Sequence, residues 1–160
     1  MPEHESVDDS TIARLPVDSD VGPEDVADTS HADVLVVIAA GGALGSLARW
    51  AVGEALPAGS HGFPWSTFLE NCTGAFALGA LMVLVLDVWP TRRYLRPFLG
   101  VGVLGGYTTF STYMFDARGL LAAGHEVTAF AYLAGTLLVG LLAVWLGIVG
   151  ARAAVAGVRR

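Results

Sequence analysis

Four long apolar runs follow one another along the chain. They cover Val34 to about Gly53, about Ser66 to Leu86, about Pro97 to Phe115, and Val127 to about Ala151. A helix rises about 1.5 Å per residue, so about 20 residues cross the hydrocarbon core of a bilayer. Each run is close to that length and continuously apolar, which favours helices over strands. The pattern predicts an all-α membrane protein with four transmembrane helices, because the body has too little polar surface for the alternative, a water-soluble helix bundle.

Segments marked by Gly and Pro separate the runs, and we expect loops at residues 54–65, 87–96 and 116–126. Aromatic residues near the run ends are typical of the membrane interface: Trp50, Trp65, Trp89 and Tyr94.

Acidic residues are concentrated in the first 33 residues, which hold ten acids, one base and no aromatic residue. We predict a disordered acidic tail at 1–33, a four-helix transmembrane domain at 34–151 and a short basic tail at 152–160. The negative net charge of the chain, −6, therefore comes from the tail, and the body is weakly basic. The absence of a basic patch excludes a nucleic-acid binder. The single cysteine, Cys72, excludes a disulfide scaffold and is interpreted as a packing residue.

Arginines are concentrated on one side of the predicted bundle. An even number of spans puts both termini and the 87–96 loop on the same side, which holds Arg92, Arg93, Arg96, Arg152, Arg159 and Arg160. The opposite side holds Arg118, together with Arg49 if that residue reaches the surface there. The positive-inside rule then predicts a multi-pass protein of the cell membrane with both termini in the cytoplasm.

Polar residues inside the predicted spans need a reason to be there. Arg49 either snorkels to the interface or belongs with the small-residue face of Gly41 and Gly45, which permits close helix approach. Glu70 is expected at the interface near a helix N-terminus, where the helix dipole favours negative charge. Asn71 lies one position deeper and must find a partner or line water, so helix contact and pore lining both stay open.

The third run has an unusual composition for a transmembrane helix. Glycines at 100, 102, 105 and 106 precede the hydroxyl-rich stretch YTTFSTY at 107–113. We expect the third helix to break near Gly105-Gly106. A break inside a membrane frees carbonyls that suit a hard cation and N–H groups that suit an anion.

The residues after the expected break suit an anion. Phe110 and Tyr113 are three apart and share a face, and the edge of an aromatic ring is electropositive. Thr109, Ser111 and Thr112 can donate hydroxyl hydrogen bonds to the same ion. A packing face with hydroxyls bonded back to their own helix is the alternative for each residue alone. The cluster as a whole favours an ion pathway.

Three motifs resemble those of the CrcB/Fluc family of fluoride ion channels. GGALGSLAR (41–49) is similar to the family's GGxxGxxxR, TFLENCTGAFALG (67–79) to TLxxNxxGxxxxG, and GGYTTFSTY (105–113) to GGxTTFSTF. The motifs occur in the family's order and cover most of residues 35–115. The fourth run matches only in length and in its polar groups, Tyr132 and Thr136.

The resemblance implies four-helix subunits that pair antiparallel into a dimer with two pathways for passive fluoride export. The implied pathway residues, together with the Thr109 hydroxyl, are Asn71, Phe110, Ser111, Thr112, Tyr113, Tyr132 and Thr136. The resemblance also implies a central structural sodium ion on the backbone carbonyls of Gly105 and Thr108. Arg49 matches the first-helix arginine, and we interpret Gly41, Gly45 and Gly106 as structural residues.

The chain departs from the family pattern at several points. Tyr113 stands where Phe is usual, Glu70 stands where an apolar residue is common, and the acidic tail is additional. The arginine bias also departs, because subunits that pair with themselves antiparallel must insert both ways. We therefore expect a hetero-pair with an oppositely biased homologue, with a homodimer as the alternative.

Two other classes of membrane protein are alternatives to a channel. A small multidrug resistance transporter needs a glutamate in its first helix, which the first run lacks. A non-transporting membrane scaffold would not require the TTFST cluster. An enzyme is not expected, because the histidines lie in polar stretches or loops and no catalytic or metal-ligand spacing occurs.

Overall fold

A computed structural model describes residues 32–56, 62–89 and 92–158. These residues form the helices α3 (Ala32–Ala55), α4 (Trp65–Asp87), η1 (Arg96–Leu104), α5 (Gly105–Tyr107), α6 (Phe110–Ala122) and α7 (Glu126–Val158). This part of the chain contains no strand, as the all-α prediction requires. Of the tail predicted at 1–33, residues 1–31 lie outside the described residues, as do Arg159 and Arg160, whereas Ala32 and Asp33 are helical and begin α3.

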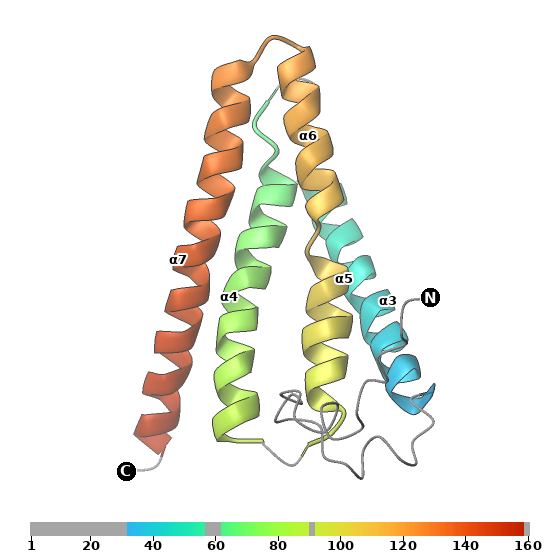
Figure 1. The fold of residues 1–160 in the computed structure, drawn as a ribbon, viewed down its shortest axis with the longest axis vertical. Helices are drawn as coiled ribbons and strands as arrows, with labels where there is room; N and C mark the ends of the chain where they lie inside the picture. Colours follow the sequence, from blue (N-terminus) through green and yellow to red (C-terminus); the bar gives the residue numbers. More distant parts are fainter. Residues whose placement is uncertain (1–31, 57–61, 90–91, 159–160) are drawn as a thin grey trace, which may run out of the picture. The chain divides into compact units, whose positions relative to one another are not determined.

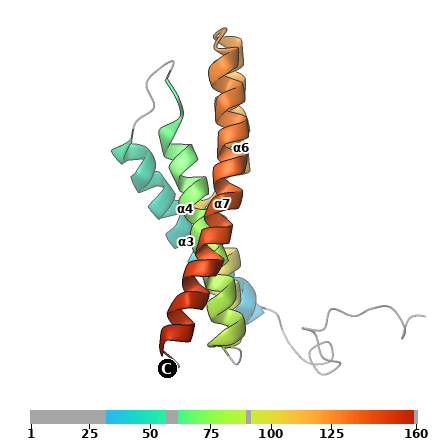
Figure 2. The same ribbon diagram turned by 90° about the vertical axis from the view of Figure 1, so that its left-hand side faces the viewer.

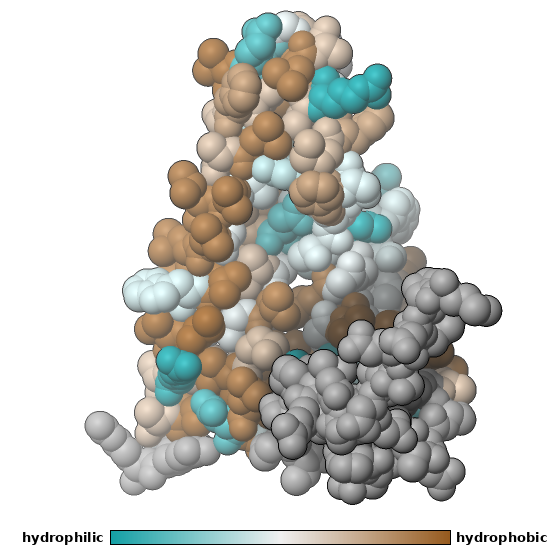
Figure 3. Space-filling model, in the orientation of Figure 1, coloured by the Kyte–Doolittle hydropathy of each residue, from teal (hydrophilic) through white to brown (hydrophobic). Residues whose placement is uncertain are grey.

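Three helices among the described residues are long and apolar enough to cross a membrane. They are Ala32–Ala55, Trp65–Asp87 and Glu126–Gly157, and they correspond to the first, second and fourth apolar runs. The third run is divided among η1, α5 and α6. Large apolar side chains cover the outer side of α7 (Figure 3). Among the residues of this helix, Leu138 and Val127 are 65% and 85% exposed. Such a face is suited to lipid rather than to water.

Successive segments run in alternating directions (Figure 1). The beginning of α3, the segment before η1 and the end of α7 therefore lie at one end, and the α6–α7 connection lies at the other. Helix α4 packs mainly on α7, whereas α3 packs mainly on η1 and α5. Figure 1 shows α4 between α7 and the third segment, and Figure 2 shows α7 in front of α4 with α3 crossing behind it.

The third segment breaks after the glycine pair and not at it. Helix α5 continues through Gly105 and Gly106 to Tyr107, and the backbone of Thr108 and Thr109 is extended (φ −81°, ψ 156° and φ −147°, ψ 128°). The break therefore lies near the glycine pair, as predicted, but begins two residues beyond it. A Cβ at Gly106 would meet the backbone of Gly42, so this glycine permits close packing on α3 and leaves the helix intact.

Helix α3 packs on η1 through its glycines. Gly41 and Gly45 are the buried residues of α3, and a Cβ at either would collide with a carbonyl oxygen of η1, that of Phe98 or Val103. These two glycines form the small-residue face that the sequence indicates. Helix η1 is wound as a π-helix, a rare form that occurs frequently at functional sites.

The predicted loop at 116–126 is mostly helix. Helix α6 extends to Ala122, and only a short connection precedes α7. Gly124 has φ 76°, and the N–H of His125 donates to the carbonyl of Leu120 at 2.9 Å, which closes the helix end. The polar residues Asp116 and Arg118 resemble loop residues in the sequence, but Asp116 faces inward and accepts hydrogen bonds.

At the opposite end, Asp33 links the beginning of α3 to the segment before η1. Its carboxylate accepts a hydrogen bond from the Tyr94 hydroxyl at 2.5 Å and lies 3.7 Å from the Arg93 guanidinium. The hydrogen bond to the carboxylate raises the pKa of Tyr94 above its ordinary value.

Candidate functional site

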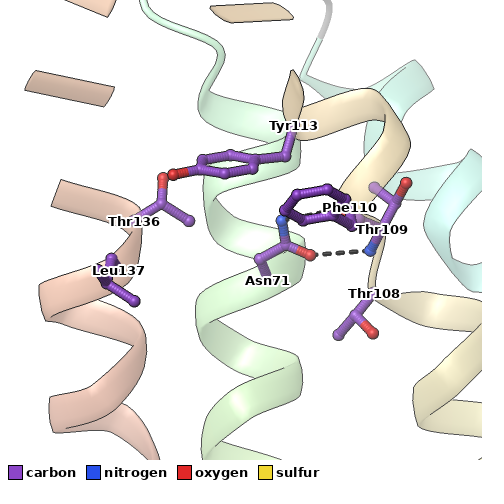
Figure 4. Close-up of a pocket in the computed structure, with 7 residues that line it drawn as sticks. All are labelled: Asn71, Thr108, Thr109, Phe110, Tyr113, Thr136 and Leu137. Atoms are coloured by element: carbon purple, nitrogen blue, oxygen red, sulfur yellow. Dashed lines mark hydrogen bonds between the residues drawn. The ribbon is translucent and has the colours of Figure 1, made fainter. Parts of the chain in front are cut away.

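A cavity of about 340 Å³ lies at the break in the third segment (Figure 4). Helices α4, α6 and α7 contribute its walls together with the extended residues. It is lined by Asn71, Thr108, Thr109, Phe110, Tyr113, Thr136 and Leu137. The cavity thus brings together residues that are far apart in the sequence, including five of those expected along the ion pathway.

Asn71 holds the extended backbone of the break in place. Its amide Nδ2–H donates to the carbonyl of Thr109 at 3.0 Å, and its Oδ1 accepts from the N–H of Thr109 at 2.9 Å (Figure 4). The side chain therefore replaces the helical hydrogen bonds that the extended residue cannot make. An amide nitrogen carries two hydrogens, so one donor is available beyond the bond to Thr109.

The hydroxyl of Thr109 begins helix α6. It accepts from the N–H of Thr112 at 3.2 Å and donates to the Thr112 hydroxyl at 3.1 Å, and it lies 3.3 Å from the Ser111 hydroxyl. This arrangement caps the helix N-terminus. Ser111 and Thr112 do not line the cavity with Asn71. Ser111 is exposed, and Thr112 lines a second cavity described below.

Phe110 and Tyr113 differ in how firmly their side chains are held. Their ring centroids are 6.0 Å apart with planes at 48°, and Phe110 is 75% exposed. The hydroxyl of Tyr113 reaches across the cavity and donates to the carbonyl of Leu133 on α7 at 2.7 Å. Tyr113 is therefore fixed to α7 by the hydroxyl that distinguishes it from phenylalanine.

The polar residues expected on the fourth helix have different surroundings. Thr136 lines the cavity, but its hydroxyl donates to the carbonyl of Tyr132 at 2.7 Å within α7. Tyr132 does not line the cavity and is completely buried. It packs in the cluster with Ala117, Leu120 and Ala129, which makes it a core residue in this chain.

A half-buried carboxylate lies beside this core and was missed in the sequence. Asp116 on α6 accepts from the Thr67 hydroxyl at 2.8 Å and from the Tyr132 hydroxyl at 3.4 Å. The assignment of residue 116 to a loop concealed it. Asp116 follows Tyr113 by three residues, and on a helix that continues the third segment this spacing would have placed both side chains on the same face.

Arg49 points into the bundle at the break. Its Nη1–H donates to the carbonyl of Thr108 at 3.4 Å, and the residue is only half-buried. Of the two possibilities in the sequence, contact with the bundle describes its position better than snorkelling.

Backbone oxygens at the break have the chemistry of a cation site. The N–H of Thr109 donates to Asn71, so it does not serve the carbonyl of Gly105 as it would in a continuous helix. The carbonyl of Gly105 therefore fits a hard cation such as sodium, which prefers oxygen ligands. The carbonyl of Thr108 accepts from Arg49 with one lone pair and has a second lone pair for the same ion. Within the described ranges, no group of three His, Cys, Asp or Glu side chains is placed to hold a metal.

A second cavity of about 370 Å³ lies on the α3 side of α4 and α6. Its polar lining includes Arg49, Glu70, Ser46, Thr67 and Thr112. Glu70 is only 4% exposed, so the expectation of an interfacial carboxylate was wrong. The helices that surround this cavity bury Glu70, although it lies near the start of α4.

The sequence is similar to that of a known protein family and to those of several named proteins. Residues 36–148 match the family described as CrcB-like protein, camphor resistance. The chain is 50% identical over 127 residues to the fluoride-specific ion channel FluC 2 of Nocardia farcinica, covering 79% of this chain and 91% of that one.

Two relatives come from Streptomyces avermitilis. The chain is 52% identical over 107 residues to the fluoride-specific ion channel FluC 2, covering 67% of this chain and 68% of that one. It is 47% identical over 123 residues to FluC 3 of the same organism, covering 77% of this chain and 60% of that one. All three relatives are named as ion channels and none as an enzyme.

Proposed function

The chain belongs to the CrcB-like family, and from this premise we propose that it is a subunit of a fluoride channel that lets fluoride leave the cytoplasm passively. The observation that carries the proposal is the cavity at the break, where the Asn71 amide meets the rings of Phe110 and Tyr113. An amide N–H and aromatic edges are weak, fixed donors without full charge.

Such donors suit the transport of a strongly hydrated ion. Removing water from fluoride is costly, so a pathway must replace it with several well-placed groups. A fixed full charge in the pathway would hold the ion too tightly for conduction. We propose that the spare N–H of Asn71 and the edge of Phe110 contact the ion. Ser111, Thr112 and Thr109 supply hydroxyls nearby, and Tyr113 and Thr136 line the opposite wall.

We propose that four spans cross the membrane and that two subunits pair antiparallel. The divided segment of residues 96–122 supplies the span that is not a single helix. Phe110, Ser111 and Thr112 are exposed on this segment, and lipid offers no partner for hydroxyl groups. A second subunit against this face would cover them.

The arginine distribution supports a fixed orientation with both termini in the cytoplasm, and hence pairing with an oppositely oriented homologue. Streptomyces avermitilis has two different relatives, FluC 2 and FluC 3, so one organism can contain more than one such chain. A homodimer is the alternative assembly.

We propose that sodium, as a structural ion at the dimer centre, would be held by the carbonyls of Gly105 and Thr108. The support is the extended backbone after Tyr107, which leaves these oxygens outside regular helical bonding. Bound there, the ion would supply a positive charge that holds the two breaks together.

Fluoride efflux from liposomes, followed with a fluoride electrode, tests the proposed function. The chain is reconstituted alone and together with an oppositely biased homologue from its own organism, and efflux is expected from at least the pair. Phe110→Ile should abolish efflux, because an aliphatic side chain has no electropositive edge. Phe130→Ile is the matched control, since Phe130 is 65% exposed on α7 and lines neither cavity. Absence of efflux from both preparations, or normal efflux with Phe110→Ile, contradicts the proposal.

A further inference from the structure

Glu70 is a buried carboxylate that the proposed pathway does not use. It lies on α4 immediately before Asn71 but points in a different direction from the helix, so that it lines the second cavity. Only 4% of the residue is exposed. A carboxylate in such surroundings is costly unless another group balances its charge.

Arg49 is the group that can balance it. Arg49 lines the same cavity from α3, and within the described residues no ion pair joins it to Glu70. The other acidic side chains nearby either accept hydrogen bonds from other residues or are exposed, so they are less suited to balance the charge of Arg49. Asp116 accepts hydroxyl hydrogen bonds from Thr67 and Tyr132, and Glu54 is exposed at the end of α3. Arg49 and Glu70 therefore form the pair of opposite charges that faces across the cavity.

The position of Arg49 gives this pair a consequence for the break. The guanidinium donates to the carbonyl of Thr108, the first extended residue after α5. A long arginine side chain loses considerable conformational freedom when it is held in one place. A negative charge across the cavity stabilises the orientation in which the positive charge stays inside the bundle.

We propose that Glu70 is the counter-charge of Arg49 across the second cavity, and that it is a positioning residue which holds the guanidinium at the Thr108 carbonyl. The carboxylate acts through Arg49 and does not contact the transported ion. The inference rests on the proposed function only for its efflux measurement.

Variants that separate charge from shape test the proposal. Glu70→Gln keeps the shape and loses the charge, whereas Glu70→Asp keeps the charge on a shorter side chain. In detergent, Glu70→Gln should lower the midpoint of thermal unfolding by about 4–8 °C and slow fluoride efflux. Glu70→Asp should retain most of both properties. Glu54→Gln, an acid lining the same cavity but exposed, is the matched control and should resemble the unmodified chain.

A double-mutant cycle supplies the decisive comparison. Arg49→Gln combined with Glu70→Gln should be no less stable than Arg49→Gln alone, because the second change then removes an unbalanced charge. Additive losses, or a Glu70→Asp variant as impaired as Glu70→Gln, would overturn the proposal. If no preparation conducts fluoride, the proposed function fails, and the unfolding cycle still decides the role of Glu70.

Discussion

At the scale of single residues, Asn71 makes the contact between helices that was one of the two alternatives in the sequence, and the other alternative, pore lining, stays a prediction. Its amide exchanges two hydrogen bonds with the backbone of Thr109, which is helix contact, and it also lines the cavity. Asn71→Asp keeps the acceptor for the Thr109 N–H, but it removes the donor to the Thr109 carbonyl. We expect this variant to abolish fluoride efflux, because a carboxylate repels both that carbonyl and an anion in the cavity.

The measurement for Asn71→Asp is liposome efflux together with thermal unfolding in detergent. A single unsatisfied buried carbonyl costs about 1–3 kcal/mol, so the unfolding midpoint should fall while the protein stays folded. Normal efflux from this variant would remove Asn71 from the pathway.

Tyr113 gives the opposite expectation. Because its hydroxyl donates to the carbonyl of Leu133, that hydroxyl is engaged within the subunit. Tyr113→Phe should therefore retain fluoride efflux while lowering the free energy of unfolding by about 1 kcal/mol, the usual contribution of one hydrogen bond. Efflux reduced tenfold or more with unchanged stability would mean that the phenol acts on the ion instead.

At the scale of the elements, the packing of α3 on η1 depends on two glycines. A Cβ at Gly45 would collide with the carbonyl oxygen of Val103, which belongs to the backbone and cannot move aside cheaply. Gly45→Ala should destabilise the chain by about 1–3 kcal/mol, as overpacking does. Gly53→Ala on the same helix is the control, because a Cβ there meets nothing within 4 Å. Equal unfolding midpoints for the two variants would contradict this account.

The same scale explains what the sequence could and could not predict. Apolar runs located α3, α4 and α7 to within a few residues at most ends, because hydrophobic length is a local property. The break lies two residues beyond the glycine pair near which it was predicted, because Asn71 on another helix holds the backbone of Thr109. Glu70 was misplaced for a similar reason, since its burial depends on how other helices pack around α4, which no local pattern in the sequence determines.

The cavity was predictable in composition and less so in detail. The motif containing Phe110 and Tyr113 indicated the aromatic pair that lines it. The burial of Tyr132 and the inward position of Asp116 depend on how α6 and α7 pack, and no spacing in the sequence determines that packing.

At the scale of the whole molecule, the distribution of arginine bears on assembly. Arg92, Arg93 and Arg96 lie at the end that also holds the beginning of α3 and the end of α7 (Figure 1). Arg118 is exposed near the other end, and Arg49 is turned inward to Thr108, so it does not offset the bias. The structure therefore strengthens the asymmetry on which the expected orientation depends.

This asymmetry predicts that the chain inserts in one direction only. Two reporters are fused after the C-terminus in separate experiments. The reporter that functions only in the cytoplasm should be active, and the reporter that functions only outside the cytoplasm should be inactive. Arg118→Gln should leave this result unchanged, whereas replacing Arg92, Arg93 and Arg96 by Gln should produce both orientations. A chain of single orientation cannot form an antiparallel pair with itself, so fluoride efflux should then require co-expression of an oppositely biased homologue. Activity of both reporters in the unmodified chain, or full efflux from the chain purified alone, would instead establish the homodimer.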